Sequence, residues 1–199
     1  MSISIENISF TRNERNLLNE ITAYLAPGQW LDVRGTNGSG KSTLLRIVAG
    51  FIKPDSGKIT LPAFHYMGHA GGLQPQLRVT EQIDWQCALM DKKIKRKIIE
   101  DAIHRVGLTS MRNAFTRELS AGQQRRLRFA ILHLIPRPLW ILDEPYTALD
   151  HDAQLLLNTL LEDHLQKNNM AIIATHHAIT IHTPPTQLIQ LDGKLCFSL

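Results

Sequence analysis

The chain has 199 residues, of which 43% are hydrophobic and 20% are charged, and its formal net charge at pH 7 is +4. This length and composition fit one folded α/β domain with room for an inserted subdomain, and they exclude an intrinsically disordered protein. No apolar run approaches the roughly 20 residues of a membrane-spanning helix. The N-terminus does not resemble a secretory signal, and the two cysteines lack metal-binding or redox spacing.

The first part of the chain predicts β-structure. Ile3, Ile5 and Ile8 alternate with polar residues, which indicates a half-buried strand. A turn is expected over residues 12–16, and further strands are expected near residues 21–25 and 30–34. The last of these strands leads directly into a glycine-rich segment.

That segment, GTNGSGKS at residues 35–42, matches the pattern G-x-x-x-x-G-K-[ST]. In this pattern the glycines let backbone N–H groups turn toward a phosphate chain, and the lysine supplies a positive charge. Apolar residues recur at helical spacing over residues 44–51, so a helix N-terminus is expected to face the phosphates. We expect Lys41 to contact the β- and γ-phosphates, Ser42 to help hold Mg²⁺, and Thr43 to contact the α-phosphate. The candidate nucleotide-binding residues of this segment are Gly35, Thr36, Asn37, Gly38, Ser39, Gly40, Lys41, Ser42 and Thr43.

Residues from about 74 to 118 are richer in charge and in helix formers, and we expect them to form a helical subdomain inserted between strands. One helix should bury a stripe made of Ile94, Ile98, Ile99, Ala102, Ile103 and Val106. The run KKIKRK at residues 92–97 is most simply a solvated helix face. It contains no interleaved aromatic residue, which disfavours binding to single-stranded nucleic acid.

The segment LSAGQQRR at residues 119–126 precedes a helix whose apolar stripe includes Leu127 and Leu134. Ser120 is suited to be the N-cap of that helix, and Gly122 permits a close approach of another backbone. Spacing alone does not distinguish this segment from an ordinary capped helix.

Two continuous apolar runs, at residues 139–143 and 171–175, are typical of strands buried in a parallel sheet. Asp143 ends the first run, where its carboxylate is suited to hold Mg²⁺. Glu144 follows and could orient and polarise an attacking water as a general base. The alternative is that this acidic pair caps a helix. A C-terminal hairpin is expected from residues 187–191 and 194–198.

Five motifs occur in the order found in the ABC-transporter ATPases, and the chain resembles that family over nearly its whole length. They are GTNGSGKS, LSAGQQRR, LWILDEP, TALD at residues 147–150 and ATHH at residues 174–177. The resemblance implies an α/β P-loop fold with a mostly parallel core sheet, an antiparallel β-layer and the helical subdomain, so that residues 1–199 form a single ATP-binding domain. It also implies ATP hydrolysis with Mg²⁺ by a head-to-tail homodimer. Each ATP would touch Lys41 of one subunit and Ser120 and Gly122 of the other.

Further roles follow from the same resemblance. His176 matches the histidine that reaches the γ-phosphate, and Asp150 matches a loop that links the two sites of the dimer. Arg12 stands where most members place an aromatic residue against adenine; a guanidinium can also stack on a base, and Phe10 is a nearby substitute. His69 replaces the glutamine that usually precedes the helical subdomain, and an imidazole cannot reproduce an amide's simultaneous donor and acceptor.

Within this family, YMGH at residues 66–69, LSAGQQRR and LWILDEPYTALD together resemble the ATP-binding subunits of haem-export systems for cytochrome c maturation. This implies integral membrane partners resembling CcmB and CcmC, docked near residues 69–78, and a peripheral location on the cytoplasmic face of the bacterial inner membrane. We expect no direct haem ligation, because no C-x-x-C-H motif is present.

Two alternatives stay open at this stage. One is the ATPase of another small ABC exporter or extruder. The other is a soluble ABC ATPase that acts on nucleic acid, although such proteins usually carry two cassettes or a long coiled coil. We therefore expect no nucleic-acid partner.

Overall fold

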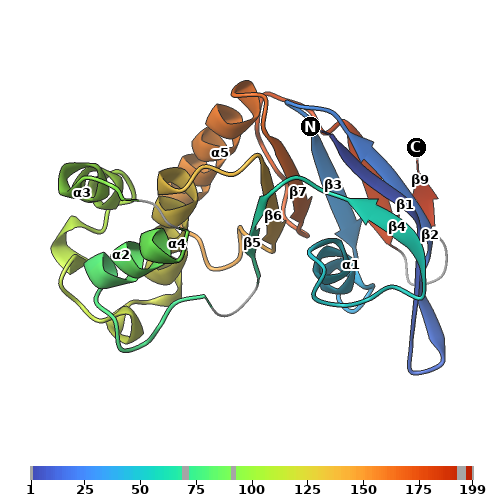
Figure 1. Ribbon diagram of the computed structural model, residues 1–199, viewed down its shortest axis with the longest axis horizontal. Coiled ribbons are helices and arrows are strands. Elements are labelled where there is room, and N and C mark those ends of the chain that lie inside the picture. Colours follow the sequence, from blue (N-terminus) through green and yellow to red (C-terminus); the bar gives the residue numbers. More distant parts are fainter. Residues whose placement is uncertain (1, 69–71, 91–92, 192–195, 199) are drawn as a thin grey trace. The chain divides into compact units, whose positions relative to one another are not determined.

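The computed structural model describes residues 2–68, 72–90, 93–191 and 196–198, and it divides into two compact units (Figure 1). The sheet unit comprises Met1–His69, Arg137–Tyr146 and Leu161–Leu199. The helical unit comprises Ala70–Pro136 and Thr147–Leu160, and therefore takes in the 74–118 segment with further residues. That the chain is one domain with an inserted subdomain stays a prediction.

The larger sheet of the sheet unit has the strand order β5-β6-β7-β3-β8-β9. Its strands are β3 (Trp30–Gly35), β5 (Phe64–Met67), β6 (Leu139–Asp143), β7 (Met170–Ala174), β8 (Gln187–Leu191) and β9 (Cys196–Ser198). The first five strands in the sheet order are parallel, and β9 pairs antiparallel with β8, as the expected C-terminal hairpin requires. Every residue of β6 and β7 is buried, which explains their continuous apolar sequences.

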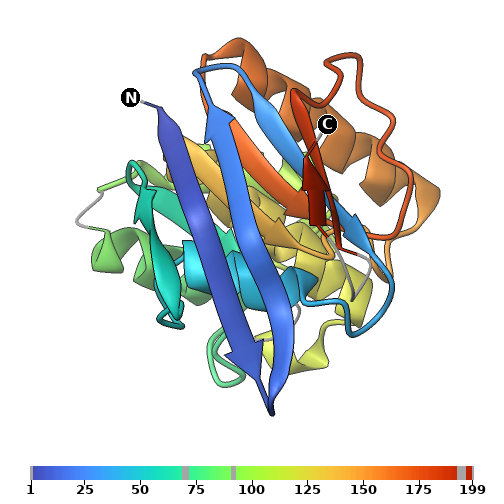
Figure 2. The same ribbon diagram turned by 90° about the vertical axis from the view of Figure 1, so that its right-hand side faces the viewer.

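The smaller sheet is antiparallel and has the order β2-β1-β4 (Figure 2). Its strands are β1 (Ile3–Arg12), β2 (Arg15–Leu25) and β4 (Ser56–Thr60). The expected turn over residues 12–16 is shorter than predicted, because only Asn13 and Glu14 separate β1 from β2. Both residues have positive φ, 49° and 60°, as a two-residue hairpin turn of matching twist requires.

Helix α1 (Lys41–Val48) packs its apolar face into one core with residues of both sheets. The predicted helical spacing was wrong at Phe51, whose side chain is 63% exposed. The helix ends earlier because Gly50 N–H donates to Ile47 O and Phe51 N–H donates to Arg46 O, which satisfies the terminal carbonyls. Phe51 therefore lies beyond the helix and off its buried face.

The helical unit contains α2 (Val79–Leu89), α3 (Arg96–Arg105), α4 (Ala121–Leu134) and two short 3-10 turns, η1 (Thr109–Met111) and η2 (Thr116–Glu118). Helix α5 (His151–Gln166) begins in this unit and ends in the sheet unit. Within the described residues, no helix is both long and apolar enough to cross a membrane.

The predicted buried stripe of α3 is correct for Ile99, Ala102, Ile103 and Val106 and wrong for two residues. Ile98 is 49% exposed, and Ile94 lies before the helix begins. The four buried residues already follow the spacing i, i+3, i+4, i+7 of one helix face, so Ile98 falls at its edge.

Candidate nucleotide-binding site

The phosphate loop at residues 35–42 joins β3 to α1, as the sequence predicts. Gly40 is the N-cap of α1, and Lys41 is its first residue. The Lys41 side chain is 7% exposed and folds back over the loop, where its Nζ donates to Gly35 O at 2.8 Å and Thr36 O at 3.1 Å. The loop carbonyls thus hold the ammonium group beside the N-terminus of α1, where an anion is favoured.

Gly35 is required by the packing of this loop. Its φ is +150°, and a Cβ placed there would lie 2.3 Å from the carbonyl oxygen of Leu191 and 2.4 Å from Ser39 Oγ. Backbone from β8 and a buried hydroxyl from within the loop therefore meet at this position. Any larger residue would push the start of the loop away from the sheet.

The acidic end of β6 meets the phosphate loop. Asp143 is 1% exposed, and its Oδ1 accepts a hydrogen bond of 2.9 Å from Ser42 Oγ. The two residues are 101 positions apart in sequence and are joined by the sheet. A hydroxyl and a carboxylate side by side are the oxygen donors that Mg²⁺ prefers, so this pair fits a magnesium ion.

Glu144 is held by three neighbours. Its backbone N–H donates to Ala174 O at 2.7 Å, and its Oε2 lies 3.1 Å from Thr175 Oγ1 and 2.9 Å from His176 Nδ1. Its φ of 49° is uncommon for a residue with a side chain, and such strain concentrates at functional positions. Lys41 Nζ lies 4.0 Å from Oε1. The structure thus brings Lys41, Glu144 and His176 into one group.

The ionisation of Glu144 follows from these contacts. Burial opposes its charge, but the hydrogen bond and charge of His176, together with Thr175, outweigh burial and lower the pKa of the carboxyl. Glu144 is therefore an anion at neutral pH and can accept a proton. The alternative of an acidic helix cap is not supported, because the next helix, α5, begins only at His151.

A pocket of about 370 Å³ opens beside these residues. It is lined by Arg12, Leu17, Asn37, Gly38, Gly40, Lys41, Ser42, Thr43 and Glu144. Arg12 thus lines the same pocket as the phosphate loop, whereas Phe10 packs against the hydrophobic core. That Arg12 contacts adenine stays a prediction. Sequence reasoning missed Leu17, whose Cγ would lie 3.0 Å from a Cβ added at Gly40. Its place near the tip of the β1–β2 hairpin, five residues after Arg12, was the available signal.

The remaining predicted residues divide between the two units and the undescribed part of the chain. His176 follows β7 in the sheet unit, and its side chain is 54% exposed. Its ring therefore contacts Glu144 and is also accessible from solvent. Its neighbour His177 is partly buried and its ring lies 4.2 Å from that of His176. His69 lies outside the described residues.

In the helical unit, Ser120 caps α4. Its Oγ accepts from Gln123 N at 3.2 Å, and Gln123 Oε1 accepts from Ser120 N at 2.9 Å, so the predicted N-cap is confirmed. Ser120 Oγ acts as an acceptor in the bond from Gln123 N–H, so the hydroxyl hydrogen is still available for donation. Ser120 is exposed, so this donor can reach a ligand outside the unit.

The loop before α5 packs against the same segment. A Cβ added at Gly122 would lie 3.1 Å from Ala148 O, which gives a steric reason for glycine. Arg126 Nη2 donates to both carboxylate oxygens of Asp150, at 2.6 and 2.8 Å. Residues 119–126 and TALD at 147–150 are therefore held together within the helical unit.

Comparisons with known proteins agree with this geometry. Residues 18–147 match the family described as ABC transporter. The chain is 40% identical to the cytochrome c biogenesis ATP-binding export protein CcmA of Methylococcus capsulatus, over 88% of this chain and 91% of that protein. It is 39% identical to the protein of the same description from Rhizobium etli, over 90% of each chain.

A solved structure described as the ATP binding subunit of an ABC transporter has a TM-score of 0.86 over 100% of this chain and 90% of that chain. At 20% sequence identity this likeness is evidence about the fold alone, and it confirms the predicted P-loop ABC ATPase fold. On these sequence matches the chain belongs to the ABC transporter ATP-binding family and, within it, to the group of cytochrome c biogenesis ATP-binding export proteins.

Proposed function

We propose that this chain is the ATP-hydrolysing subunit of a membrane ABC complex that serves cytochrome c biogenesis by haem export or by release of a haem-loaded chaperone. The observation that carries the proposal is the grouping of Lys41 and Ser42 with Asp143, Glu144 and His176 in one site. The relatives described as cytochrome c biogenesis ATP-binding export proteins support the biological role. Another small exporter stays the alternative, and no described residue favours it.

The chain's own groups suggest how ATP is held. Lys41 leaves its loop carbonyls to meet the β- and γ-phosphates, while backbone N–H groups of the loop and the start of α1 surround the phosphate chain. Ser42 and Asp143 would hold Mg²⁺, which when bound neutralises developing charge on the phosphates. Arg12, on the wall of the same pocket, stacks on the base.

Glu144 is the proposed base. Its carboxylate is ionised by the contacts described above and can accept a proton from the water that attacks the γ-phosphate. His176 fixes the orientation of this carboxylate through Nδ1 and offers its other ring nitrogen to the γ-phosphate. Replacing Glu144 with glutamine keeps the shape of the side chain and removes its basicity.

We also propose that the site is completed by a second copy of the chain in a head-to-tail homodimer. The exposed hydroxyl of Ser120 and the backbone at Gly122 would meet the γ-phosphate bound by the partner subunit. ATP then closes the dimer by contacting both copies, and hydrolysis removes those contacts. Membrane subunits resembling CcmB and CcmC would use this motion, with the chain placed on the cytoplasmic face of the inner membrane.

The catalytic part of the proposal is tested by ATPase assays on purified protein and on the membrane complex. Glu144→Gln should bind ATP and form a dimer in size-exclusion chromatography with light scattering, yet turn over at least about a hundredfold more slowly, the usual range for loss of a general base. His176→Ala should also slow turnover, whereas His177→Ala, its neighbour in sequence, is the matched control and should not. Rapid turnover by Glu144→Gln would mean that the base is another group.

The biological part needs the complex. Tagged Glu144→Gln protein is purified with ATP from gently solubilised membranes, and its partners are identified by mass spectrometry and haem absorbance. Recovery of subunits resembling CcmB and CcmC, with haem on a partner, supports the assignment. Recovery of a different permease keeps the ATPase mechanism and refutes the role in cytochrome c biogenesis.

A further inference from the structure

Strand β3 carries a charged pair that the ATP chemistry described above does not use. Asp32 and Arg34 alternate with apolar residues, and because side chains two positions apart share a face of a strand, both lie on one face. Arg34 Nε donates to Asp32 Oδ2 at 2.8 Å and lies 2.8 Å from Oδ1 as well. Asp32 is only 6% exposed. A carboxylate buried this deeply needs a partner for its charge, and Arg34 supplies one.

The rest of the Arg34 guanidinium reaches the segment that follows β7. Its Nη1 donates to the backbone carbonyl oxygen of His177. Because Nε is bound to Asp32, the planar guanidinium is fixed in orientation, and its second nitrogen is aimed at that carbonyl. Arg34 thus ties β3 to the residue that directly follows His176.

Two further hydrogen bonds hold the segment at residues 175–177. Thr175 N–H donates to Val33 O at 3.3 Å, and His177 N–H donates to Thr175 Oγ1 at 3.1 Å. Thr175 Oγ1 donates in turn to Glu144 Oε2 at 3.1 Å, and His176 Nδ1 lies 2.9 Å from the same oxygen. The carbonyl of residue 177 is therefore bonded to the pair on β3, while its N–H is bonded toward the candidate site.

The same pair also borders the segment after Glu144. Tyr146, two residues further along the chain, is buried. Burial raises the pKa of the Tyr146 hydroxyl, and the charges of Arg34 and Asp32 act on that pKa in opposite directions, which shows that both lie close to it. The pair is therefore a neighbour of the two segments that carry Glu144 and His176.

We propose that Arg34, oriented by Asp32, is a positioning residue that holds His176 against Glu144 by fixing the carbonyl of residue 177. The proposal rests on the proposed roles of Glu144 and His176 in ATP hydrolysis. The side chain of His176 is more than half exposed, so packing alone does not fix its ring, and the position of its backbone decides where the ring lies. A misplacement of about 1 Å in a catalytic site can cost about a hundredfold in rate. Arg34 therefore supports turnover and contributes little to ATP affinity.

Arg34 also precedes Gly35, the first residue of the phosphate loop, so the rival explanation is that it supports ATP binding. A distorted phosphate loop would raise the KM for ATP, whereas a displaced His176 would lower kcat. Steady-state ATPase assays on the purified chain and on the membrane complex separate the two. Arg34→Lys keeps a positive charge beside Asp32 but replaces the planar fork by a single nitrogen. It should lower kcat about tenfold and change KM by less than about twofold.

A double-mutant cycle tests whether Arg34 acts through His176. In the His176→Ala background, Arg34→Lys should change kcat by less than about twofold, because the ring that it positions is gone. Effects that multiply instead would mean that Arg34 acts elsewhere, and the proposal would fail.

NMR spectra of the histidine rings give a readout that does not depend on turnover. Because a carboxylate only accepts, His176 Nδ1 carries the hydrogen of its bond to Glu144. The Nδ1 signal of His176, assigned by its absence from the spectrum of His176→Ala, should shift in Arg34→Lys. An unshifted signal would show that the ring keeps its place without the guanidinium, and it would overturn the proposal.

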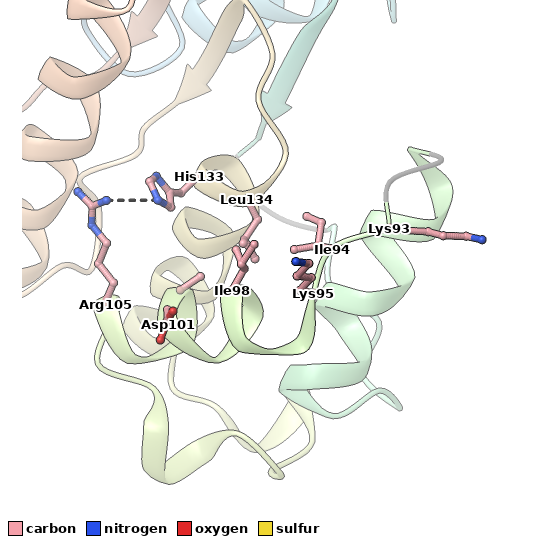
Figure 3. Close-up of a pocket in the computed structure, with 9 residues that line it drawn as sticks. Lys93, Ile94, Lys95, Ile98, Asp101, Arg105, His133 and Leu134 are labelled. Carbon is pink, nitrogen blue, oxygen red and sulfur yellow. Dashed lines mark hydrogen bonds between the residues drawn. The ribbon is translucent and has the colours of Figure 1, made fainter.

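Two substitutions are matched controls. Arg105→Lys makes the same chemical change on α3, where the guanidinium Nη1 lies 3.3 Å from His133 Nε2 (Figure 3). Trp30→Phe removes a hydrogen bond of 2.9 Å from β3 to the carbonyl of Thr183, which also follows β7. Both should leave kcat within about twofold of wild type. A loss of about tenfold in Trp30→Phe would show that any bond from β3 to this segment has the same effect, which would overturn a specific role of Arg34.

A further variant keeps the test valid should Arg34→Lys fail to fold. Asp32→Leu with Arg34→Leu removes the pair without leaving a buried charge unpaired, a change that proteins often tolerate. It should reproduce the loss of about tenfold in kcat. An unchanged kcat in both variants, or a raised KM with unchanged kcat, would overturn the proposal. Rapid turnover by His176→Ala would count against the proposed function, and the NMR shift in Arg34→Lys would still decide whether Arg34 holds His176 in place.

Discussion

Replacing His164 with glutamine tests how a buried imidazole links the stability of the sheet unit to pH. His164 lies on α5, is 6% exposed and stacks on Trp140 of β6, with ring centroids 3.8 Å apart and an interplanar angle of 16°. Its Nε2 lies 3.0 Å from Met170 O; because a carbonyl only accepts, this nitrogen carries the hydrogen. Burial lowers the pKa of His164 to about 4, and the hydrogen bond to Met170 does not offset it.

The magnitude follows from the two pKa values of this group. The folded chain binds the proton only near pH 4, whereas the unfolded chain binds it near pH 6.5. The stability that neutral His164 permits is therefore fully present above pH 6.5 and is lost as the pH falls toward 4. At about 1.36 kcal/mol per unit, the whole loss is about 3.4 kcal/mol, and about 2 kcal/mol of it is reached at about pH 5.

Urea unfolding followed by tryptophan fluorescence measures this loss. The free energy of unfolding is compared at about pH 7.5 and about pH 5, a range above the main titration of carboxylates. Wild type should lose about 2 kcal/mol more than His164→Gln between these two pH values. His104→Gln, at an exposed position on α3, is the control and should follow wild type. Equal losses in wild type and His164→Gln would refute the reasoning.

Three further predictions concern the candidate site. Gly35→Ala should weaken binding of a fluorescent ATP analogue by more than about tenfold, because the added Cβ would lie 2.3 Å from Leu191 O. Gly38→Ala should weaken this binding less, because a Cβ added at Gly38 meets no other heavy atom within 4 Å. A larger loss of binding in Gly38→Ala than in Gly35→Ala would contradict the packing argument. Ser120→Ala should destabilise the chain by about 1 kcal/mol through loss of the helix cap. Ser120→Asn should keep the cap yet slow ATP turnover, and normal turnover would exclude a role for the hydroxyl. Thr175→Val removes a hydrogen bond that lowers the pKa of Glu144, so the acid limb of the pH–rate profile should move to higher pH; an unmoved limb would assign it to another group.

Much of the fold could be predicted from local patterns. The continuous apolar runs at 139–143 and 171–175 predict buried strands. In a parallel sheet covered on both faces, side chains on either face are buried, so apolar and polar residues do not alternate along a strand. The first of these matches β6 in full, and the second is displaced by one residue from β7. The errors lie at element ends, at Phe51 and in the turn after β1, where hydrogen bonds of the last turn and positive φ values decide the boundary.

Other errors depend on packing. Ile98 was placed on the buried face of α3 because hydropathy alone does not say how wide the contacted face is. Strand β4 was not predicted, since SGKIT is mostly exposed and carries little apolar signal. The strand order β5-β6-β7-β3-β8-β9 also lies beyond local reasoning, because all buried parallel strands have similar sequences.

The sequence by itself determined the phosphate loop, the cap of α4 and the acidic end of β6, because each depends on residues that are close together in the chain. Only the tertiary structure decided that Ser42 meets Asp143 and that Glu144 is held by Thr175 and His176. The physical reason is that parallel strands deliver their carboxyl ends to one edge of the sheet. Ser42 and Asp143, 101 residues apart in the chain, become neighbours there, and no local sequence pattern predicts such a contact.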